Sequence, residues 1–214
     1  MWIKYYQIYQ KKTKTKNEQL IFKHRLFMIE MKKDKKIIYL ASDHAGFDLK
    51  EKIKKYLNSI KIVYKDLGPY KLDKQDDYPD YIIPAARKVS QDKNSLGIIV
   101  GGSGQGEAIA ANKVKGIRAA VLYSYNENIV KLSREHNNSN VLSLGARFLN
   151  KKEAIKAVSL WLKTSFSEEE RHKRRLKKIE DFENKTKFPK IKPFKWGKKT
   201  KNTSNEINKI LYIK

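Results

Sequence analysis

Residues 96–114 read Leu-Gly-Ile-Ile-Val-Gly-Gly-Ser-Gly-Gln-Gly-Glu-Ala-Ile-Ala-Ala-Asn-Lys-Val. An apolar run meets a glycine-rich loop over residues 101–106, and an alanine-rich segment follows, which is the pattern of a strand, a loop and a helix. Four of the chain's ten glycines lie in this loop. Unpaired backbone N–H groups ahead of a helix bind anions, because the helix dipole is positive there. The stretch therefore predicts a site for an anionic group or a developing oxyanion.

The loop matches neither common nucleotide-binding pattern. It lacks the Gly-Lys-Ser/Thr ending of a nucleoside-triphosphate loop, and Gly-x-Gly-x-x-Gly fits it in no register. Its distinctive neighbour is Glu107, a carboxylate in the first turn of the predicted helix. One interpretation of Glu107 is a partner of the helix dipole. The other is a base that abstracts a proton α to a carbonyl, beside an oxyanion site.

The composition limits the class of protein. A chain of 214 residues with 40% hydrophobic residues suits one α/β domain with additions. It contains no cysteine, which excludes a disulfide framework, a thiolate metal site and a thiol nucleophile. No apolar stretch reaches ~18 residues, so we predict no transmembrane helix and expect a cytoplasmic protein.

The formal charge of +25 is concentrated at the two ends of the chain. Residues 1–36 carry a net charge of +8 and residues 184–214 a net charge of +9, which leaves +8 for residues 37–183. We predict a basic N-terminal extension, a central domain and a basic, disordered tail with these boundaries. Residues 188–199 interleave aromatic side chains with lysines, as single-strand nucleic-acid binders do, so RNA binding through the ends is an alternative function.

Predicted strands and helices alternate along the central domain. The strands are expected over residues 37–41, 61–63, 98–100, 119–122 and 141–144. The helices are expected over residues 47–59, 80–91, 107–114, 126–135, 151–163 and 167–183. This alternation predicts a five-stranded parallel α/β sheet covered by helices on both faces. In such sheets, ligands bind at the carboxyl ends of the strands.

Polar residues follow three of the predicted strands. Asp43 and His44 follow the first, the glycine loop follows the third and Arg147 comes shortly after the fifth. Because the carboxyl ends of parallel strands meet at one edge, these residues are expected to lie close together. Alternatively, Asp43 caps the helix that follows it. His136 ends a predicted helix, where a histidine is alternatively a dipole partner.

The last predicted helix carries a cluster of cations. Ser167 stands three residues before Glu170, which is the pattern of a capping box. Arg171 and Arg175 are four residues apart and share one face of the helix. Two arginines on one face form either a solvated surface or a clamp for a phosphate group.

Six motifs occur in order along the chain. They are Ser42-Asp43-His44-Ala45-Gly46, Asp77-Tyr78-Pro79, Gly101 to Glu107, Ala110-Ala111-Asn112-Lys113, Arg134 to Asn138, and Arg171 to Arg175. Together they resemble the ribose-5-phosphate isomerase B family, part of a larger sugar-phosphate isomerase family that includes the galactose-6-phosphate isomerase subunits. The resemblance covers about residues 37–183 and neither end. It implies a flavodoxin-like doubly wound fold with C-terminal helices, a homodimer, and no metal or organic cofactor.

The resemblance also implies an aldose–ketose isomerase that interconverts ribose 5-phosphate and ribulose 5-phosphate through an enediolate. Some family members use a cysteine base at the position of Gly101, whereas others place a glutamate after the loop, where Glu107 stands here. Without cysteine, this chain is similar to the glutamate type. By the same resemblance, Asp43 and His136 assist ring opening, with His136 as the proton donor. Ser103 adds a hydroxyl hydrogen bond or moves a proton between the sugar oxygens.

A second set of residues is implied in substrate binding. The backbone groups that hold the enediolate oxygens belong to Gly102, Gly104, Gln105 and Gly106. The phosphate is bound by His44, Arg147, Arg171 and Arg175, and Asn137 contacts a sugar hydroxyl. In the family the site lies at a subunit interface and takes residues from both chains. A six-carbon sugar phosphate, such as galactose or allose 6-phosphate, would need the same chemistry and stays an alternative substrate.

Overall fold

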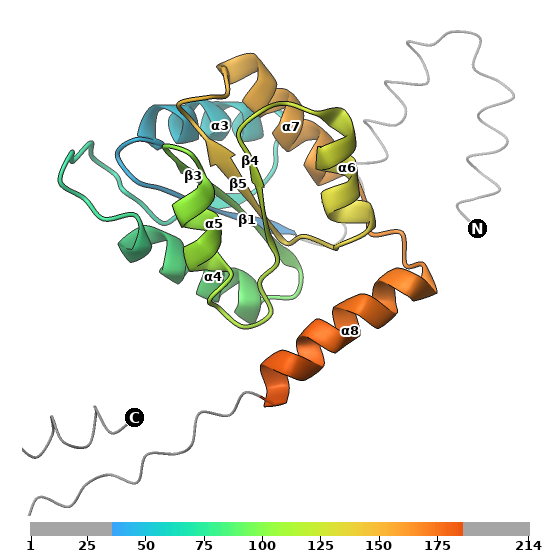
Figure 1. The fold of residues 1–214 in the computed structure, drawn as a ribbon. Coiled ribbons are helices and arrows are strands. Elements are labelled where there is room, and N and C mark those ends of the chain that lie inside the picture. Colours follow the sequence, from blue (N-terminus) through green and yellow to red (C-terminus); the bar gives the residue numbers. More distant parts are fainter. Residues whose placement is uncertain (1–35, 186–214) are drawn as a thin grey trace, which may run out of the picture. The chain divides into compact units, whose positions relative to one another are not determined.

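The computed structural model describes residues 36–185 of the chain. Five strands form one parallel sheet, with helices on both of its faces (Figure 1). The predicted doubly wound α/β class is therefore confirmed. None of the helices within the described range is long and apolar enough to cross a membrane. The predicted N-terminal extension, the predicted disordered tail and their alternative role in RNA binding lie outside the described residues, apart from residues 36, 184 and 185.

The order of the strands places the ends of three of them together. The strands are β1 (Ile37–Ser42), β2 (Tyr64–Asp66), β3 (Ser95–Gly101), β4 (Ala119–Leu122) and β5 (Val141–Gly145). The helices are α3 (Phe47–Ser59), α4 (Pro79–Gln91), α5 (Gln105–Ala111), α6 (Glu127–Glu135), α7 (Lys151–Lys163) and α8 (Glu170–Lys185). The sheet order is β2-β1-β3-β5-β4, which is the flavodoxin-like order with its last two strands exchanged. This exchange places β5 beside β3.

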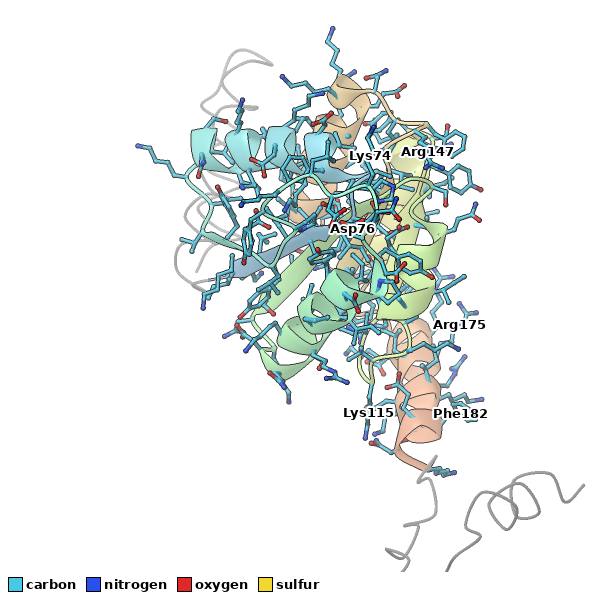
Figure 2. All side chains as sticks on the ribbon, turned by 90° about the vertical axis from the view of Figure 1, so that its left-hand side faces the viewer. Lys74, Asp76, Lys115, Arg147, Arg175 and Phe182 are labelled. Atoms are coloured by element: carbon cyan, nitrogen blue, oxygen red, sulfur yellow. The ribbon has the colours of Figure 1, made fainter. Side chains whose placement is uncertain are left out.

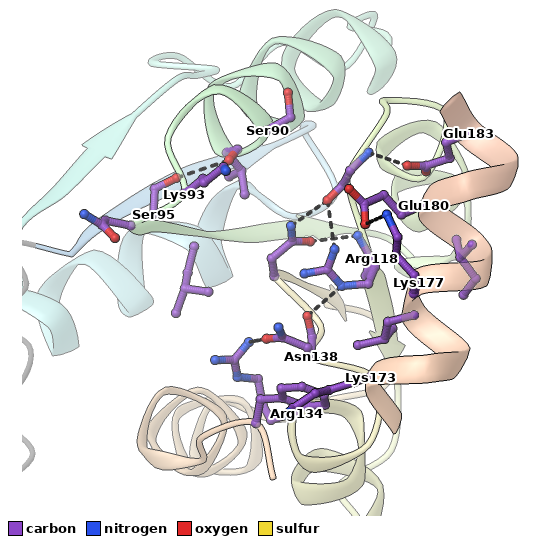
Figure 3. A pocket seen from close by; sticks show the side chains of 18 of the residues that line it. Ser90, Lys93, Ser95, Arg118, Arg134, Asn138, Lys173, Lys177, Glu180 and Glu183 are labelled. Atoms are coloured by element: carbon purple, nitrogen blue, oxygen red, sulfur yellow. Dashed lines mark hydrogen bonds and ion pairs between the residues drawn. The ribbon is translucent and has the colours of Figure 1, made fainter. Parts of the chain in front are cut away.

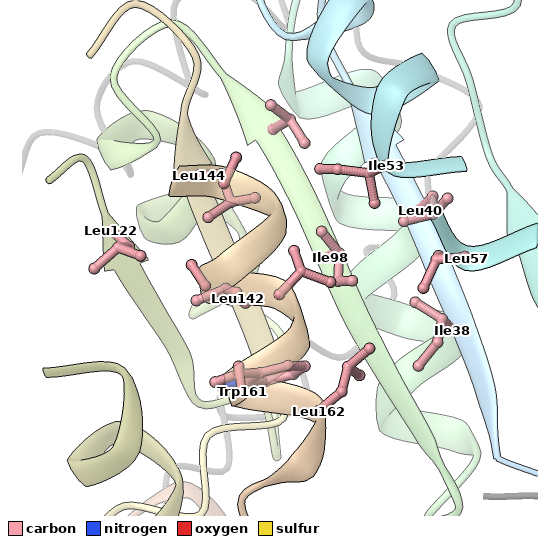
Figure 4. Close-up of a cluster of buried hydrophobic side chains, with 14 of the residues drawn as sticks. Ile38, Leu40, Ile53, Leu57, Ile98, Leu122, Leu142, Leu144, Trp161 and Leu162 are labelled. Carbon is pink, nitrogen blue, oxygen red and sulfur yellow. The ribbon is translucent and has the colours of Figure 1, made fainter. Parts of the chain in front are cut away.

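Successive residues of the strands face opposite layers of helices. Ile38 and Leu40 of β1 pack with α3 and α7 on one face, whereas Tyr39 and Ala41 pack with α4 and α5 on the other. Figure 4 shows the first cluster, with Ile98 of β3 among its members. Because both faces are buried, the central strands are continuous apolar runs, which is why their positions are predictable from the sequence.

One predicted strand is wrong in position. The strand expected over residues 61–63 lies at Tyr64–Asp66. Lys61 has a left-handed backbone conformation, with φ of 55°, just after the end of α3. Such residues terminate helices, so the turn at the end of α3 occupies the positions where the strand was expected.

The start of the last helix also differs from the prediction. Helix α8 begins at Glu170 rather than near Ser167, because Glu168 has a φ of 57°, which no right-handed helix contains. The capping box predicted from Ser167 and Glu170 is therefore wrong. The backbone N–H of Ser167 donates instead to the carbonyl of Glu135, at 3.1 Å, and so connects this turn to the end of α6.

Candidate active site

The carboxyl ends of β1, β3 and β5 lie side by side, because these strands are neighbours in the sheet. Asp43 and His44 follow β1, the loop of residues 101–106 follows β3, and Arg147 follows β5. The backbone N–H of Arg147 donates to the carbonyl of Gly102, at 3.0 Å, so the segment after β5 is bound to the loop after β3. We name the predicted residues at this edge the carboxyl-edge group. It comprises Asp43, His44, Gly102, Ser103, Gly104, Gln105, Gly106, Glu107 and Arg147.

The glycine loop is held in place by its own contacts. Gly104 has a φ of 76° and precedes the first residue of α5, a position that favours glycine. Its carbonyl accepts a hydrogen bond from Ser143 Oγ, at 2.6 Å, and the N–H of Gln105 donates to Ser103 Oγ, at 3.3 Å. Within the described part of the chain, the N–H groups of Gly102 and Ser103 donate to no acceptor. The loop therefore presents free backbone donors at Gly102 and Ser103, whereas the N–H of Gln105, which the sequence also predicts as a donor, is used by Ser103 Oγ.

Glu107 lies beside this loop and is almost completely buried, with 4% of its surface exposed. Burial raises the pKa of its carboxyl group, and the negative charge of Asp43 adds to this effect. The backbone N–H groups of Glu107 and Gly104 and the guanidinium of Arg147 oppose it. A carboxylate with a raised pKa accepts a proton more readily than one in water, which suits a general base.

The carboxylate of Glu107 occupies space that only a glycine at position 101 leaves free. A Cβ atom at Gly101 would lie 1.8 Å from Glu107 Oε1 and 2.0 Å from its Cδ. Any side chain at position 101 would thus displace the carboxylate. The two kinds of base that the resemblance describes, a cysteine at position 101 and a glutamate at position 107, would compete for the same space in this chain.

Asp43 has a structural contact as well as its place in the group. It is buried, and its Oδ1 accepts a hydrogen bond of 2.9 Å from the N–H of Gly46, just before α3. This is the helix-capping type of contact that the sequence left open. The other carboxylate oxygen, Oδ2, has no hydrogen bond to the described residues.

His44 is paired with a residue that sequence reasoning did not include in the site. Its Nδ1 lies 2.6 Å from Asp76 Oδ1, and its backbone N–H donates to the same oxygen at 3.1 Å. The hydrogen bond to Asp76 raises the pKa of His44. The signal in the sequence was weak: Asp76 directly precedes the Asp77-Tyr78-Pro79 motif, 32 residues from its partner.

The other predicted residues lie at the opposite edge of the sheet. Helix α6 leads from the carboxyl end of β4 to the amino end of β5, and α7 makes the same crossing before α8 begins. We name the predicted residues at this edge the amino-edge group: His136, Asn137, Arg171 and Arg175. Figure 2 shows the separation, with Arg147 and Arg175 labelled far apart. In the described residues, no hydrogen bond, ion pair or ring contact joins the two groups, so one chain does not bring them together.

Three members of the amino-edge group, Asn137, Arg171 and Arg175, are exposed, and His136 is half-buried. The ring of His136 stacks on that of His172, with centroids 4.2 Å apart and an angle of 16° between the planes. His172 is buried, and burial lowers the pKa of its imidazole. Arg171 Nε lies 2.8 Å from Glu169 Oε2 on an exposed surface, and Asn137 is exposed. His172 is a second neighbour of the site to which the sequence assigned no role.

A hollow of about 870 Å³ lies between α8 and the amino edge of the sheet (Figure 3). None of the predicted site residues lines it. Two of its charged side chains bind the protein's own backbone: Arg118 Nε donates to the carbonyl of Asn138, at 2.9 Å, and Glu183 accepts the N–H of Gly116, at 3.0 Å. The contact of Glu183 attaches α8 to the segment that precedes β4.

Metal binding has no support in the described residues, where no group of three His, Cys, Asp or Glu side chains is placed to hold an ion. The absence of a metal and of an organic cofactor stays a prediction.

Comparison with known proteins gives one consistent family. The model of the Ribose/Galactose Isomerase family matches residues 38–179. Ribose-5-phosphate isomerase B of Mycolicibacterium paratuberculosis is 40% identical over 154 residues, which cover 72% of this chain and 96% of that protein. The probable ribose-5-phosphate isomerase B of Mycoplasma genitalium is 44% identical over 150 residues, covering 70% of this chain and 97% of that protein.

Two solved structures are similar to the chain as well. The crystal structure of ribose-5-phosphate isomerase B from Mycoplasma genitalium with bound ribulose-5-phosphate has a TM-score of 0.67 and 42% identity, covering 71% of this chain and 98% of that chain. Ribose-5-phosphate isomerase B of Clostridium thermocellum has a TM-score of 0.66 and 38% identity, covering 71% of this chain and 99% of that chain. On the family match and these identities, the chain belongs to the Ribose/Galactose Isomerase family.

Proposed function

We propose that this chain interconverts ribose 5-phosphate and ribulose 5-phosphate, with Glu107 as the base. The reaction is supported by relatives of about 40% identity that are named ribose-5-phosphate isomerase B. A similar solved structure has bound ribulose-5-phosphate. The observation that carries the assignment of the base is the buried Glu107 carboxylate beside a loop with unpaired N–H groups.

Ring opening comes first, because the C2 proton becomes acidic only beside a free carbonyl. His136 donates a proton to the ring oxygen, a role that histidine often takes as a general acid. Asp43 accepts the proton of the C1 hydroxyl as the C1 carbonyl forms. The product is the open-chain aldehyde.

Isomerisation then proceeds through an enediolate. Glu107 removes the proton from C2, and the electron pair forms the C1–C2 double bond while the C1 oxygen becomes negative. The N–H groups of the glycine loop stabilise that oxygen, at about 3 to 4 kcal/mol for each donor in comparable sites. Glu107 returns the proton to C1, and Ser103 Oγ helps to move a proton from the C2 oxygen to the C1 oxygen. This sequence leaves a carbonyl at C2 and a hydroxyl at C1.

A homodimer brings the two groups of residues together. In one chain they lie at opposite edges of the sheet, so we infer that the amino-edge group of one subunit faces the carboxyl-edge group of its partner. Two exposed aromatic residues at the carboxyl edge, Tyr123 after β4 and Phe148 after β5, support a contact with a partner subunit there. Their rings form an edge-to-face pair with centroids 6.3 Å apart. Arg171 and Arg175 of the partner subunit then join His44 and Arg147 around the phosphate.

The test is turnover of ribose 5-phosphate by the full chain and by Glu107→Gln. Because a general base contributes about 100- to 10,000-fold, we expect the variant to lose that much of kcat. Glu127→Gln is a matched control, since Glu127 is also a first-turn glutamate but is exposed and paired with Lys131. It should keep the wild-type rate.

Two outcomes would contradict the proposal. Turnover of galactose or allose 6-phosphate but not of ribose 5-phosphate would show that the substrate is wrong. A Glu107→Gln variant with nearly wild-type kcat would show that the base is wrong.

A further inference from the structure

Asp76 lies in the loop between β2 and α4, and its carboxylate faces the end of β1. Its Oδ1 accepts two hydrogen bonds from one residue, from the backbone N–H and from the ring Nδ1 of His44, at 3.1 and 2.6 Å. The side chain of Asp76 is 4% exposed and that of His44 is 32% exposed. Asp76 is thus a buried acceptor behind a ring that reaches the surface.

This double contact fixes both the rotation of the imidazole and the place of its proton. With Nδ1 directed at Asp76, Nε2 lies on the side of the ring turned away from the carboxylate. An ionised carboxylate only accepts hydrogen bonds, so Nδ1 keeps its proton whether His44 is neutral or charged. Nε2 can therefore donate a hydrogen bond only when the imidazole is charged.

The charged groups around the ring favour that charged form. The hydrogen bond to Asp76 raises the pKa of His44 most, and the charges of Asp43 and Asp76 raise it further. Partial burial and the Arg147 guanidinium lower it. On α4, Tyr81 is another titratable neighbour of the same carboxylate, and its pKa is raised by burial first and then by Asp76.

The buried carboxylate of Asp76 has His44 as its cationic partner. Its second oxygen, Oδ2, is buried without a hydrogen-bond partner, and no other cation of residues 36–185 forms an ion pair with it. A buried carboxylate with an unpaired oxygen is unfavourable unless a positive charge lies close by. The positive charge of a protonated His44 therefore stabilises the buried carboxylate.

We propose that Asp76 is a positioning residue that directs the Nε2–H of His44 towards the phosphate group of the substrate. The proposal rests on the proposed function, because the ligand is a phosphorylated sugar. Arg147 supplies the second cation of this edge: its guanidinium lies against Gly102, where an added Cβ would be 3.0 Å from Arg147 Cζ. An imidazolium and a guanidinium together match the charge of a phosphate dianion.

The kinetic test compares Asp76→Asn with Asp73→Asn. The first keeps the size and an acceptor oxygen but removes the charge behind His44. The second removes a charge from an exposed residue of the same loop, whose Oδ1 accepts the N–H of Gln75 at 2.9 Å, a bond that an amide oxygen can replace. We expect Asp76→Asn to raise the KM for ribose 5-phosphate about tenfold at pH 8, as the loss of one charged hydrogen bond would. At pH 6 its KM should approach that of the wild type, with kcat nearly unchanged at both pH values, and Asp73→Asn should keep the wild-type KM.

An NMR titration of the His44 ring tests the same proposal without turnover, with His44→Gln to assign the signal. We expect His44 to titrate at lower pH in Asp76→Asn than in the wild type and in Asp73→Asn. Inorganic phosphate at pH 8 should shift the His44 signal in the wild type and much less in Asp76→Asn.

The results that would overturn the role of Asp76 differ from those that would overturn the proposed function. An unchanged His44 titration in Asp76→Asn, a KM increase that is equal at pH 6 and pH 8, or no response of wild-type His44 to phosphate would overturn the role of Asp76. If His44 responds to phosphate as expected but no phosphorylated sugar is turned over, the proposed function is wrong and the role of Asp76 as the residue that directs His44 at a phosphate stands.

Discussion

The carboxylate of Glu107 is buried in space that Gly101 leaves free, and burial raises its pKa. The folded state therefore favours the protonated carboxyl group, whereas proton abstraction needs the ionised form. The guanidinium of Arg147 and the backbone N–H groups of Gly104 and Glu107 oppose this effect of burial, but the pKa stays raised. A site that raises the reactivity of a base in this way reduces the stability of the fold.

Replacing this residue should therefore stabilise the protein. Between the ordinary pKa of 4.5 and the raised folded pKa of Glu107, the folded state binds more protons than the unfolded state, so stability falls as the pH rises through that window. Glutamine is never ionised, so we expect Glu107→Gln to melt a few degrees above the wild type at pH 7, with the difference lost near pH 4. Thermal unfolding at the two pH values measures this.

The same measurement has a control of opposite sign. The hydrogen bond to Lys131 lowers the pKa of Glu127, so this residue contributes stability that is present above pH 4.5 and lost as the pH falls through its folded pKa. Glu127→Gln should be slightly less stable than the wild type at pH 7. A Glu107→Gln variant that melts below the wild type at pH 7 would contradict the buried-charge explanation.

At the scale of elements, predictability follows from the apolar pattern. The strand at Ala119–Leu122 and the helix at Phe47–Ser59 occur where the sequence predicts them, because the first is a continuous apolar run and the apolar residues of the second repeat with the helical period. Strand β2 was misplaced because it is three residues long, lies at the edge of the sheet and contains no fully buried residue. The backbone conformation of Glu168, which sets the start of α8, has no sequence signal of that kind.

Helix α3 also anchors the loop that carries Asp76. Lys50 is fully buried, and its Nζ donates to Asp66 Oδ1, at 2.8 Å, and to the carbonyl of Pro69, at 2.7 Å. The helical pattern did not predict a buried lysine on this face. Both acceptors belong to the end of β2 and the start of the loop, so Lys50 joins the helix to the segment that leads to Asp76.

We expect Lys50→Met to lower the free energy of unfolding by about 3 kcal/mol, because a buried acceptor at Pro69 loses its charged donor. Asp66 would retain Lys54 Nζ at 2.7 Å, which limits the loss. Chemical denaturation measures the change. Lys52→Met, an exposed position on the same helix, should change the stability by less than about 0.5 kcal/mol; equal effects of the two variants would contradict the role of Lys50.

At the scale of the whole molecule, the proposed site is larger than one chain provides. The members of the carboxyl-edge group were predictable together, because they follow parallel strands that end at one edge. The position of the amino-edge group depends on α6 and α7 crossing to the other edge, which the order of motifs along the chain does not reveal. The contact of Asp76 with His44 joins two loops 32 residues apart, and no periodic pattern marks such a pair.

The composite site can be tested with mixed dimers of two inactive variants. Glu107→Gln and His136→Asn each alter every site in their own homodimers, so both should lose most of the activity on ribose 5-phosphate. A mixed dimer, coexpressed with two tags and isolated through both, contains one intact site and one doubly altered site if the two residues come from different chains. A control dimer of Glu107→Gln with Asp43→Asn alters one carboxyl-edge residue in each site and should stay inactive.

The activity of the isolated Glu107→Gln and His136→Asn mixed dimer is therefore the most direct measurement. If Glu107 is the isomerase base and the partner subunit's His136 completes its site, this dimer recovers about half of the wild-type rate. A mixed dimer as inactive as its parents, or a chain that forms no dimer, would contradict this arrangement.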